Sequence, residues 1–347
     1  MKPVTAIAMS GGIDSLVSAS ILKETGRNVF GIHFTTGFEV PRLRAEHDPV
    51  HELGDQLGIS IRTVDLSAMF RREVVGYFIR TYRDGKTPNP CLVCNPVIKF
   101  GALLTAAEET GAEVLATGHY ARVVQGGDGR YQLLKGLDRR KDQSYFLGFL
   151  SQHQLSRACF PLGEMTKEET RAYAEKKGLK PVTRSESQDV CFVRENSYSE
   201  FLEKYGGIRP ASGPIVTLDG EIVGHHSGLH MFTVGQRRGI NCPSSEPFYV
   251  IRLETDTNTL VVGRKPDLSS ESCVVEQLNW LDSPVEFPLE ADVRLRYRHR
   301  AVPATVLPHG PGKAEVRFSS PQNAATPGQG AVFYMEDRVV GAGIIAS

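Results

Sequence analysis

Residues 4–24, with the sequence VTAIAMSGGIDSLVSASILKE, place two glycines between a short apolar run and a helix-forming segment. The apolar residues 4–9 predict a buried strand, and residues 16–24 predict the helix that follows it. Gly11 and Gly12 let backbone N–H groups approach an anion closely, and the helix amino terminus adds the positive end of its dipole. The stretch therefore predicts a strand, a phosphate-binding loop and a helix, the first part of an α/β fold.

The polar residues of the loop support this interpretation. Ser10 and Ser15 add hydroxyl donors, and Asp14 is a candidate ligand for Mg²⁺ beside bound phosphates. No lysine follows the glycines, so the loop is not of the Walker A type. A tight strand-to-helix turn without a ligand is the alternative, but the complete hexapeptide SGGIDS favours nucleotide binding.

The rest of the first half alternates between strand and helix patterns. Further strands are predicted at residues 28–34, 60–66 and 112–119, and helical segments at residues 48–58 and 98–110. This alternation predicts a doubly wound parallel sheet of the α/β class. A Gly-rich turn then predicts a hairpin, and the pattern TKEE predicts a capped helix start.

The second half has a different character. From about Ser199, Gly, Pro and short β-like runs replace the helices, and from about Ser269 short strands at turn-like spacing predict a small barrel or sandwich. The sequence therefore predicts a catalytic domain at residues 1–198, a small central domain at residues 199–268 and a C-terminal β-barrel domain at residues 269–347.

The composition is that of an ordinary soluble globular protein. The chain has 347 residues, a hydrophobic content of 40% and a charged content of 23%. Its amino terminus has too short an apolar run for a signal peptide, and no apolar stretch approaches the roughly 20 residues of a membrane helix. These features predict a cytoplasmic protein with no membrane partner. The formal net charge of zero gives no sign of nucleic-acid binding, which would need local basic patches.

Six cysteines in a chain of this length do not resemble a secreted disulfide framework. Cys91 and Cys94 form a CxxC pair in the stretch NPCLVCNP, which predicts a proline-bounded loop, and Cys191 lies later in the same predicted domain. Structural zinc, redox chemistry and iron–sulfur binding all use such cysteines, and the lack of a nearby histidine argues against zinc. The other three cysteines are interpreted as packing residues or carry no functional signal.

The stretch ADVRLRYRHR carries arginines at alternate positions, which on a strand would project from one face. A solvated strand face is the alternative, but four arginines at period two favour contact with a nucleic-acid backbone. A neutral protein can therefore still present a positive groove. The residues of this stripe are Arg294, Arg296, Arg298 and Arg300, and further basic residues are Arg139, Arg140, Lys141, Arg237 and Arg238.

Together these motifs resemble the bacterial tRNA 2-thiouridylases (tRNA-uridine 2-sulfurtransferases) over essentially the whole chain. The resemblance rests on SGGIDS, TPNPCLVCNPVIKF, ATGHYAR, LLKGLDRRKDQSYFL, SQDVCF, TVGQRRG, RYRHR and ATPGQGAVFY, in this order. SGGIDS also matches the SGGxDS pyrophosphate loop (PP-loop) of the ATP pyrophosphatases, whose fold is of the adenine nucleotide alpha-hydrolase-like kind. The resemblance implies an enzyme that splits ATP to AMP and pyrophosphate while it modifies tRNA.

The resemblance implies roles for individual residues. Cys94 matches the catalytic nucleophile, and Cys191 matches the cysteine that receives sulfur as a persulfide. The positions implied to bind ATP are Ala8, Met9, Ser10, Gly11, Gly12, Ile13, Asp14, Ser15, Phe34 and Gly118. The positions implied to contact the target base are Asn89, Pro90 and Cys91, and those implied to contact tRNA are His119, Lys141, Asp142, Gln143, Arg296, Tyr297 and Gln329.

The implied reaction has two stages. ATP, with Mg²⁺, adenylates the C2 oxygen of the wobble uridine, and a sulfur nucleophile then attacks C2 and expels AMP. Lys99 and the dipole of the helix near it are expected to lower the pKa of the Cys94 thiol. A cysteine desulfurase, a sulfur relay protein or free sulfide is the expected sulfur donor, and in the simplest scheme a disulfide bond forms between Cys94 and Cys191.

Three features depart from the family pattern. Many members carry Asp where this chain has Cys91, and the segments after Val40 and after Gly239 are shorter than expected. The segment after Gly239 is implied to order over the active site when tRNA binds. With three thiols, Cys91, Cys94 and Cys191 are candidate ligands of a [4Fe–4S] cluster whose fourth iron binds hydrosulfide. The cluster is the favoured prediction, the persulfide relay is its rival, and zinc comes last.

Two other functions stay open at this point. Another PP-loop ATP pyrophosphatase, acting on a small molecule, would turn over ATP without tRNA, and the arginine stripe argues against it. A sulfur carrier that binds tRNA without modifying it would need no pyrophosphate loop, so SGGIDS argues against that function.

Overall fold

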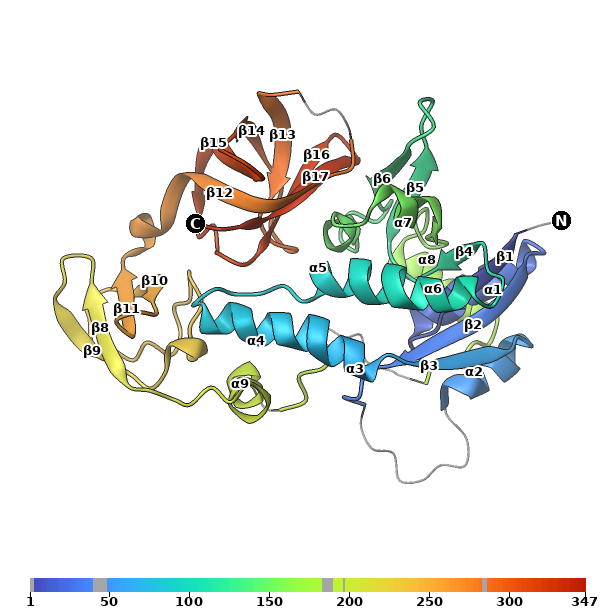
Figure 1. The fold of residues 1–347 in the computed structure, drawn as a ribbon, viewed down its shortest axis with the longest axis horizontal. Helices are drawn as coiled ribbons and strands as arrows, with labels where there is room; N and C mark the ends of the chain where they lie inside the picture. Colours follow the sequence, from blue (N-terminus) through green and yellow to red (C-terminus); the bar gives the residue numbers. More distant parts are fainter. Residues whose placement is uncertain (1–2, 40–48, 183–189, 196, 283–285) are drawn as a thin grey trace. The chain divides into compact units, whose positions relative to one another are not determined.

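The computed structural model describes residues 3–39, 49–182, 190–195, 197–282 and 286–347 (Figure 1). The chain forms two compact units, each built from several segments. Unit one contains residues 1–74, 91–192 and 335–341, and unit two contains residues 75–90, 193–334 and 342–347. The shortened segment after Val40 lies outside the described residues, as do the first three residues of SQDVCF. The domain limits after residues 198 and 268 stay a prediction.

A sheet of five parallel strands forms the centre of unit one. Each neighbouring pair is parallel, and the chain runs from β1 outward to β3 before it returns to the other side at β4. This order confirms the predicted doubly wound α/β fold and creates a switch point at the carboxyl ends of β1 and β4, where such sheets bind ligands. In the order β3-β2-β1-β4-β7, the strands are β1 (Val4–Ala8), β2 (Asn28–Thr35), β3 (Ile61–Asp65), β4 (Val114–Ala116) and β7 (Ala158–Cys159).

Apolar residues of the strands and of the first two helices form one core cluster in unit one. Ile7 of β1, Leu16 of α1 (Ile13–Glu24) and Leu53 of α2 (Pro49–Leu57) are 0% exposed within it. Because both faces of a parallel sheet are covered, its strands read as nearly continuous apolar runs. The loop between β1 and α1 is therefore held at both ends by buried elements.

Several short helices connect or follow the strands of the parallel sheet. α8 carries the predicted capping box: the Glu169 N–H donates to the Thr166 hydroxyl at 3.1 Å, and the Thr166 N–H donates to the Glu169 carboxylate at 2.7 Å. These reciprocal bonds satisfy backbone donors at the helix start and confirm the prediction. The helices are α3 (Ser67–Phe70), the π-helical η1 (Arg71–Val75), η3 (Ser144–Leu147), α7 (Gln152–Ser156) and α8 (Lys167–Lys176).

One continuous helical stretch carries the CxxC pair, through α5 (Cys91–Cys94), η2 (Asn95–Leu103) and α6 (Leu104–Glu108). The prediction of a loop around the pair is wrong, because the helix already begins at Cys91. Pro96 has no N–H to donate to the preceding turn, and from Asn95 the chain is wound as the wider π-helix. The amide of Gln154 donates to the carbonyls of Pro96 at 2.7 Å and Phe100 at 2.9 Å and supports these wide turns.

The stretch Cys91–Glu108 is also long and apolar enough to cross a membrane, with a mean hydropathy of 1.3 over 18 residues. This length and composition correct the prediction that no such apolar stretch exists. A single helix of this kind is a weak indication of a membrane span, because core helices of globular proteins share both properties. In unit one it contributes Leu92, Ile98 and Leu103 to the buried core.

Unit two begins with α4 (Gly76–Arg83), which packs against α9 (Tyr198–Gly206). The rings of Phe78 and Phe201 meet edge to face at 6.0 Å, and Tyr82 stacks on a ring of α9. A separate four-stranded sheet confirms the predicted small central domain of β character. In the order β10-β11-β8-β9 its strands are β8 (Gly213–Thr217), β9 (Ile222–His226), β10 (Tyr249–Glu254) and β11 (Thr259–Gly263), with short turns at η4 (Leu229–Met231) and η5 (Lys265–Leu268).

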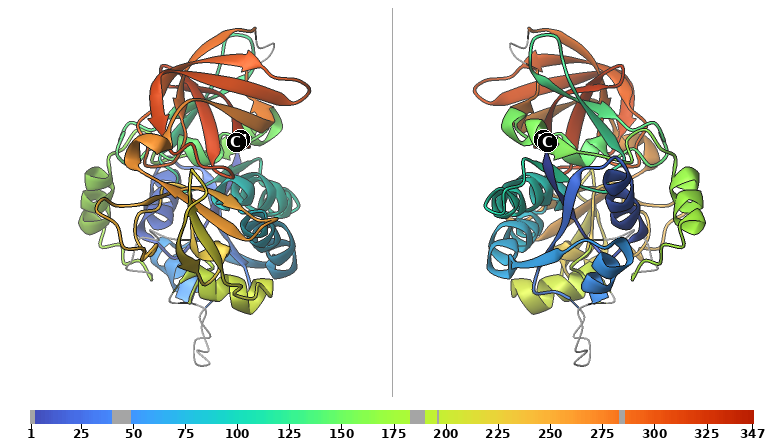
Figure 2. Two further views of the ribbon diagram at one scale, coloured as in Figure 1. Left: turned by 90° about the vertical axis from the view of Figure 1, so that its left-hand side faces the viewer. Right: turned by 90° about the vertical axis from the view of Figure 1, so that its right-hand side faces the viewer.

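Six strands form the predicted C-terminal barrel, which closes because β12 pairs with β17. Figure 2 shows these strands, coloured orange to red, curving around a common interior. Val293, Val306 and Phe333 are 0% exposed in that interior. In the order β12-β15-β14-β13-β16-β17 the strands are β12 (Ser269–Trp280), β13 (Leu289–Arg294), β14 (Val302–Pro308), β15 (Lys313–Asn323), β16 (Gly330–Met335) and β17 (Arg338–Ile345).

The last strand belongs to both units. The predicted hairpin, β5 (Ala121–Gln125) with β6 (Tyr131–Lys135), lies in unit one and pairs with the start of β17 through Arg338 and Val339. From residue 342 onward β17 belongs to unit two, where it completes the barrel. The two units therefore share a continuous strand near the end of the chain.

Candidate functional site

The SGGIDS loop lies between β1 and α1, at the switch point of the sheet. Gly11 has φ of +85°, a left-handed conformation that favours glycine, and Gly12 is the extended N-cap of α1. The Ser15 hydroxyl donates to the Gly12 carbonyl at 2.9 Å and accepts from the Ser10 N–H at 3.2 Å. These bonds curl the loop around the helix start, whose free N–H groups attract anions.

Two neighbouring segments complete the surroundings of this loop. A Cβ atom on Gly118, which follows β4, would lie 2.9 Å from the Asp14 carbonyl carbon and 3.0 Å from the Ser15 nitrogen. The His33 ring nitrogen Nδ1 lies 2.7 Å from the Met9 carbonyl, which fixes the end of β2 beside the loop. β2 also carries Phe34. The structure thus brings Gly118 and the end of β2 to the loop, while ATP binding by these residues stays a prediction.

The Asp14 carboxylate is held by a lysine that the sequence analysis did not single out. The Lys167 ammonium donates to both Asp14 carboxylate oxygens, at 2.7 and 2.9 Å, and the Tyr120 hydroxyl donates to one of them at 3.0 Å. The Lys167 side chain is only 5% exposed and lies 5.7 Å from the centre of the Tyr120 ring. A buried ammonium group therefore faces the proposed phosphate site.

A sequence signal for Lys167 did exist. It is the first residue of α8, where the positive end of the helix dipole disfavours a lysine side chain. A lysine at such a position indicates that a negative group lies nearby in the fold. The pattern TKEE was interpreted only as a capping box, so this signal was missed.

The geometry at Asp14 is not that of a ready Mg²⁺ site. Both carboxylate oxygens already accept hydrogen bonds from Lys167. Mg²⁺ is usually bound by one or two carboxylates together with substrate phosphates and water. Asp14 as it stands does not fit the metal, since the Lys167 ammonium group occupies its oxygens.

Cys91 and Cys94 lie in the first turn of the helix, and a spacing of three residues places their side chains on one face. Surrounding protein atoms displace water and raise the pKa of the Cys91 thiol to about 11 and that of the Cys94 thiol to about 12. The Lys99 charge lowers both pKa values, but by less than desolvation raises them. The effect of Lys99 on Cys94 thus has the expected direction, but desolvation outweighs it and the net pKa of Cys94 is raised.

Cys191 lies in an exposed turn of unit one, directly before the buried Phe192. Its charge raises the pKa of both Cys91 and Cys94, so the three thiols lie within electrostatic range of one another. Two distant segments of the sequence are thus brought to the same region, as the resemblance implies.

Lys99 is held by a buried histidine. Its ammonium lies 3.5 Å from the His119 ring nitrogen Nε2, and the other ring nitrogen lies 2.7 Å from the Thr117 hydroxyl. Burial, and then the charge of Lys99, lower the pKa of His119 well below its usual value, so its ring is neutral. The His119 side chain thus fixes a nearby cation that favours thiolate formation.

The three thiols suit an iron–sulfur cluster by donor chemistry. Across residues 3–39, 49–182, 190–195, 197–282 and 286–347, however, no three His, Cys, Asp or Glu side chains gather around a point that would hold a metal ion. The arrangement of Cys91, Cys94 and Cys191 as it stands therefore does not fit a cluster.

The residues implied to contact tRNA in unit one have strong partners inside the protein. Asp142 is 2% exposed, and its carboxylate accepts from the Gly136 N–H and from both donors of Ser144 at 3.0 to 3.1 Å. The Gln143 side chain accepts from the Tyr120 N–H at 3.0 Å. Lys141 is half-buried. Contact of these residues with tRNA stays a prediction.

In unit two, Gln329 supports the segment implied to contact the target base. Its amide donates to the carbonyls of Thr87 at 3.0 Å and Pro88 at 3.2 Å, directly before Asn89 and Pro90. The Thr87 N–H donates in turn to a carbonyl of the turn that carries Gln329, at 2.8 Å. The TPGQ turn of the barrel therefore holds the TPNP segment in place.

The predicted arginine stripe does not lie on one strand. β13 ends at Arg294, because the chain turns there and the Arg294 guanidinium donates to the His299 carbonyl at 3.1 Å. Arg296 donates to the Ala324 carbonyl at 2.7 Å, and Arg298 and Arg300 are exposed. The period-two interpretation is wrong beyond β13. Contact of Arg296 and Tyr297 with tRNA stays a prediction.

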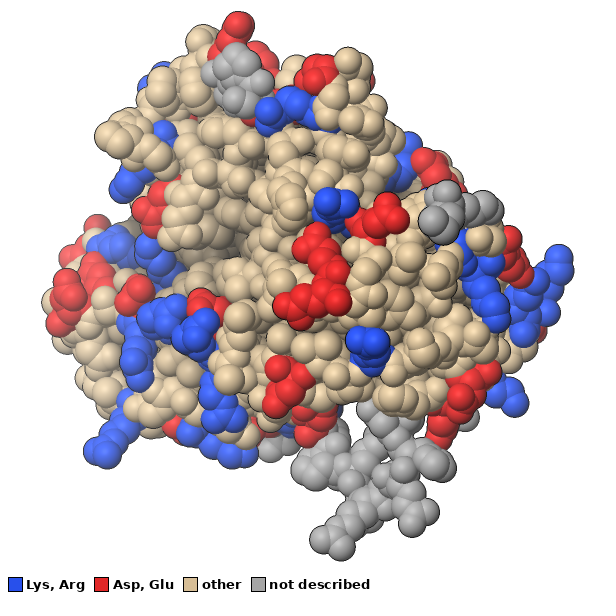
Figure 3. Space-filling model, turned by 45° about the vertical axis from the view of Figure 1, so that its right-hand side comes forward, with Lys and Arg blue, Asp and Glu red and all other residues tan. Residues whose placement is uncertain are grey.

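Other basic residues of the sequence analysis have acidic partners. Arg139 lies 2.5 Å from Asp337, and Arg140 lies 3.4 Å from Glu168. Figure 3 shows basic and acidic side chains interspersed over the face that it presents. On that face the basic side chains are most numerous toward the lower left of Figure 3, where acidic side chains lie among them.

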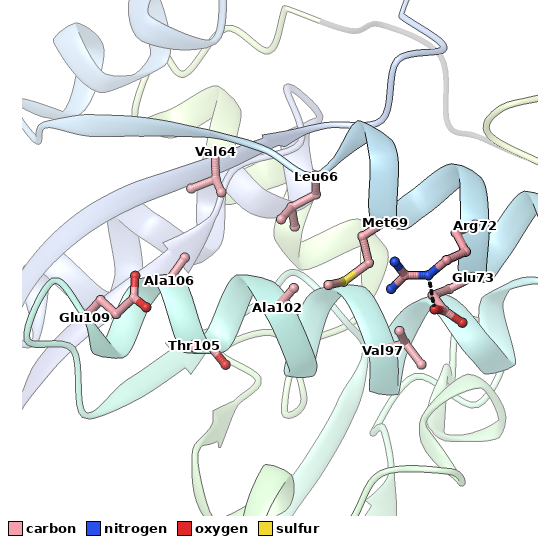
Figure 4. A pocket seen from close by; sticks show the side chains of 10 residues that line it. All are labelled: Val64, Leu66, Met69, Arg72, Glu73, Val97, Ala102, Thr105, Ala106 and Glu109. Atoms are coloured by element: carbon pink, nitrogen blue, oxygen red, sulfur yellow. Dashed lines mark hydrogen bonds and ion pairs between the residues drawn. The ribbon is translucent and has the colours of Figure 1, made fainter.

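A surface cavity of about 460 Å³ lies apart from these groups in unit one. Figure 4 shows its lining by Val64 and Leu66 at the end of β3, Met69 of α3 and the η2–α6 helix, with an ion pair between Arg72 and Glu73 at 2.6 Å on its rim. None of the predicted site residues lines it. The cavity is therefore not the site of the predicted chemistry.

Family profiles match along nearly the whole chain. They are the tRNA methyl transferase HUP domain at residues 4–195, the tRNA methyl transferase PRC-barrel domain at residues 199–264 and the aminomethyltransferase beta-barrel domain at residues 270–345. The tRNA-specific 2-thiouridylase MnmA of Desulfosudis oleivorans is 48% identical, over 99% of this chain and 95% of the relative. The chain belongs to the tRNA-specific 2-thiouridylase family.

Further 2-thiouridylase relatives agree. The proteins of that name from Syntrophotalea carbinolica and Geobacter metallireducens are 44% and 42% identical, each over 98% of this chain and over 97% and 95% of their own lengths. A solved structure of a predicted tRNA methyltransferase subunit from Methanocaldococcus jannaschii has a TM-score of 0.32 at 20% identity, over 50% of this chain and 76% of its own, too low to bear on the site. Membership of the 2-thiouridylase family confirms the resemblance found in the motifs.

Proposed function

We propose that this member of the 2-thiouridylase family is a tRNA-uridine 2-sulfurtransferase, which uses ATP to replace the C2 oxygen of the wobble uridine of tRNA by sulfur. One observation carries the proposal: unit one contains both a phosphate-binding loop at the switch point of its sheet and three thiols within electrostatic range of one another. ATP activation and sulfur transfer need these two sets of groups.

In the first stage, the C2 oxygen of the uridine attacks the α-phosphorus of ATP, and the bond to the β-phosphate oxygen breaks. Pyrophosphate leaves with the electron pair, and the C2 oxygen becomes part of a good leaving group. The N–H groups of the SGGIDS loop and the start of α1 would bind the departing pyrophosphate. Lys167 would add a positive charge there, since its ammonium already lies at Asp14.

In the second stage, a persulfide on Cys191 supplies the sulfur. Its terminal sulfur forms a bond to C2, and AMP leaves with the C2 oxygen. The Cys94 thiol, after loss of its proton, attacks the Sγ of Cys191, so the sulfur–sulfur bond breaks and its electrons stay on the sulfur at C2. The products are 2-thiouridine and a Cys94–Cys191 disulfide, which a cellular thiol reductant must reduce before the next cycle.

The buried surroundings of Cys94 suit this order of events. With a pKa of about 12 the thiol stays protonated until a base or a developing charge draws its proton away. Lys99 is the cation that favours the thiolate, and His119 holds it. Attack by Cys94 is therefore slow before the substrate is in place.

An iron–sulfur cluster on Cys91, Cys94 and Cys191 is the second candidate for sulfur delivery. It is supported by the same-face spacing of the first two thiols and by their electrostatic contact with the third. The deciding measurement is iron and acid-labile sulfide per chain in anaerobically purified protein and in Cys91→Ala. Near-stoichiometric cluster that is lost with thiolation in Cys91→Ala favours the cluster, and metal-free active protein favours the relay.

We further propose that the enzyme works in the cytoplasm. Its partners would be tRNA and a sulfur donor, which is a cysteine desulfurase, a sulfur relay protein or free sulfide. In unit two, the barrel turn that holds the TPNP segment supports contact with the target base by Asn89 and Pro90.

A direct test is thiolation of tRNA by purified protein with ATP, Mg²⁺, cysteine and a cysteine desulfurase, read by mass spectrometry of the digested nucleosides. We expect 2-thiouridine that depends on ATP and disappears in Asp14→Asn and Cys94→Ser. ATP turnover without tRNA would favour a pyrophosphatase acting on a small molecule. Unchanged thiolation of cellular tRNA in a strain carrying Asp14→Ala would favour the sulfur carrier.

A further inference from the structure

Three phenylalanine rings from separate parts of unit one form a closed aromatic cluster. Phe192 lies edge-on to Phe70, with ring centres 5.6 Å apart, and tilted against Phe38 at 6.0 Å. Phe38 and Phe70 complete the triangle at 6.3 Å. Phe70 and Phe192 are each 1% exposed, and Phe38 is 8% exposed. We call these three residues the aromatic anchor.

The aromatic anchor includes the residue that directly follows the Cys191 thiol in the chain. Phe192 directly follows Cys191, and this pair joins a fully buried ring to an exposed thiol. Consecutive Cα atoms are about 3.8 Å apart, so a fixed Phe192 leaves the Cys191 thiol only a small volume to explore. The ring therefore determines where the thiol is held.

The other two rings are themselves held firmly. The Glu39 carboxylate accepts from the N–H groups of Thr36 at 2.5 Å and Gly37 at 3.0 Å, which fixes the tight turn that presents Phe38. The Arg71 guanidinium lies 5.6 Å from the centre of the Phe38 ring. Phe70 belongs to α3, directly before Arg71. The Phe192 ring thus packs against two rings, Phe38 and Phe70, that other contacts hold in place.

The same turn connects the anchor to the nucleotide side of unit one. Phe38 follows the end of β2, the strand that carries Phe34 and His33, and His33 reaches the Met9 carbonyl of the SGGIDS loop at 2.7 Å. Cys191 in turn raises the pKa of the Cys91 and Cys94 thiols. The anchor is therefore connected to the SGGIDS loop through β2 and to the Cys191 thiol through the adjacent residue.

We propose that Phe192 is a positioning residue, which holds the Cys191 thiol within reach of Cys94 because its ring is fixed between Phe38 and Phe70. This inference rests on the proposed function, since it concerns the thiol that would carry sulfur. The gain is one of effective concentration: a thiol tethered close to its partner reacts faster than one on a loose chain.

The test measures disulfide formation between Cys94 and Cys191 without tRNA or ATP. All variants carry Cys91→Ser, so that Cys94 is the only thiol of the CxxC pair that can join Cys191. Diamide takes the two thiol hydrogens and is reduced to its hydrazine, the two sulfurs join, and the product is quantified by mass spectrometry after quenching with N-ethylmaleimide. We expect Phe192→Ala to slow the reaction about tenfold and Phe192→Leu, which keeps most of the ring volume, to stay within about threefold of the parent.

Phe78→Ala is the matched control, because Phe78 is 2% exposed and packs against an aromatic ring within unit two. Parent-like oxidation in Phe192→Ala, or equal slowing in Phe78→Ala, would overturn the proposal. If Phe192→Ala does not fold, Phe38→Leu loosens the anchor from the other side, and an unchanged rate there overturns it as well. Thiolation by the unsubstituted protein is measured separately, so loss of the proposed function is distinguishable from loss of the anchor.

Discussion

The Asp14 carboxylate is held by Lys167, which lies 153 positions later in the chain. The loop around Asp14 is recognisable from six consecutive residues, but the residue that neutralises the Asp14 carboxylate is not. With an ammonium group at 2.7 Å, Asp14 stabilises a buried cation before any nucleotide arrives. At the scale of single residues, the chemistry of the loop therefore depends on a partner from another helix.

Replacement of Lys167 tests this dependence. Lys167→Met removes the positive charge from the phosphate side of the loop and leaves Asp14 without its main partner. We expect kcat for ATP-dependent thiolation to fall by roughly 10²–10³, the size of effect typical for loss of one preorganised charge in an active site. Lys167→Arg, the matched control, is expected to retain more of the activity. Wild-type kinetics in Lys167→Met would show that the ammonium group takes no part.

The thiol of Cys94 gives a prediction for pH dependence. A raised pKa of about 12 means that only about one Cys94 thiol in ten thousand is ionised at pH 8, and that this fraction rises tenfold per pH unit. In a Cys91→Ser background, alkylation of Cys94 by iodoacetamide is expected to be slow at pH 8 and to accelerate steadily up to pH 10. The measurement is peptide mass spectrometry against time.

Lys99→Met sharpens that prediction. The Lys99 charge lowers the pKa of Cys94, so its removal raises the pKa further and slows alkylation at any given pH. Lys135→Met is the control, because Lys135 lies on the β5–β6 hairpin and bonds to the Glu336 carbonyl at 2.7 Å. A plateau in the Cys94 alkylation rate below pH 9 would contradict the raised pKa.

At the scale of elements, the site is made where β4 and β1 end beside each other. The two strands are parallel neighbours, so the residues that follow them, Gly118 and the SGGIDS loop, meet at one edge of the sheet. The thiol pair belongs to a helix start instead, and the wide π-turns from Asn95 follow directly after it. Strand order and helix start together determine the positions of the reactive groups.

Gly118→Ala tests the contact between these elements. The new Cβ would lie 2.9 to 3.1 Å from three Asp14 and Ser15 atoms, two of them backbone, so the start of α1 must shift. We expect ATP affinity to fall about tenfold or more, while the far-ultraviolet circular dichroism stays unchanged. Gly127→Ala is the control, since a Cβ there meets nothing within 4 Å. Unchanged ATP binding by Gly118→Ala in isothermal titration would contradict this account of the loop.

At the scale of the whole molecule, β17 is the element that both units need. Its first residues pair with β6 in unit one, and its later residues close the barrel of unit two against β12. Asp337, just before β17, also forms ion pairs with Arg122 at 3.0 Å and Arg139 at 2.5 Å. The end of the chain is therefore structural for both units.

A chain that stops after Tyr334 is expected to lose the closing strand of the barrel and one edge partner of the hairpin together. We expect a large loss of the cooperative thermal transition and of tRNA binding, measured by calorimetry and filter binding. Asp337→Asn is the control: it weakens two partly exposed ion pairs, each worth about 0–1 kcal/mol, and keeps the strand. A truncated chain with the thermal transition of the intact protein would contradict the shared role of β17.

The sequence by itself determined the alternating strands and helices around the SGGIDS loop, the β5–β6 hairpin, the capped start of α8 and the C-terminal barrel. These features depend on near neighbours: alternation of apolar residues, glycines at a turn, and a threonine three residues before a glutamate. The motifs also sufficed to name the family. Predictions were wrong where one local pattern is compatible with two structures. The proline-bounded CxxC pair begins a helix and does not lie in a loop, and the strand β13 ends at Arg294, before the other arginines.

Only the tertiary structure decided which distant residues meet. The pairing of Lys167 with Asp14, the support of Lys99 by His119 and the seating of Phe192 between two other rings join separate segments of the chain. The thiol pKa values also depend on the tertiary structure, because desolvation depends on all the atoms around a group and not on its neighbours in sequence. Local patterns specify elements, whereas partners and desolvation follow from how those elements pack.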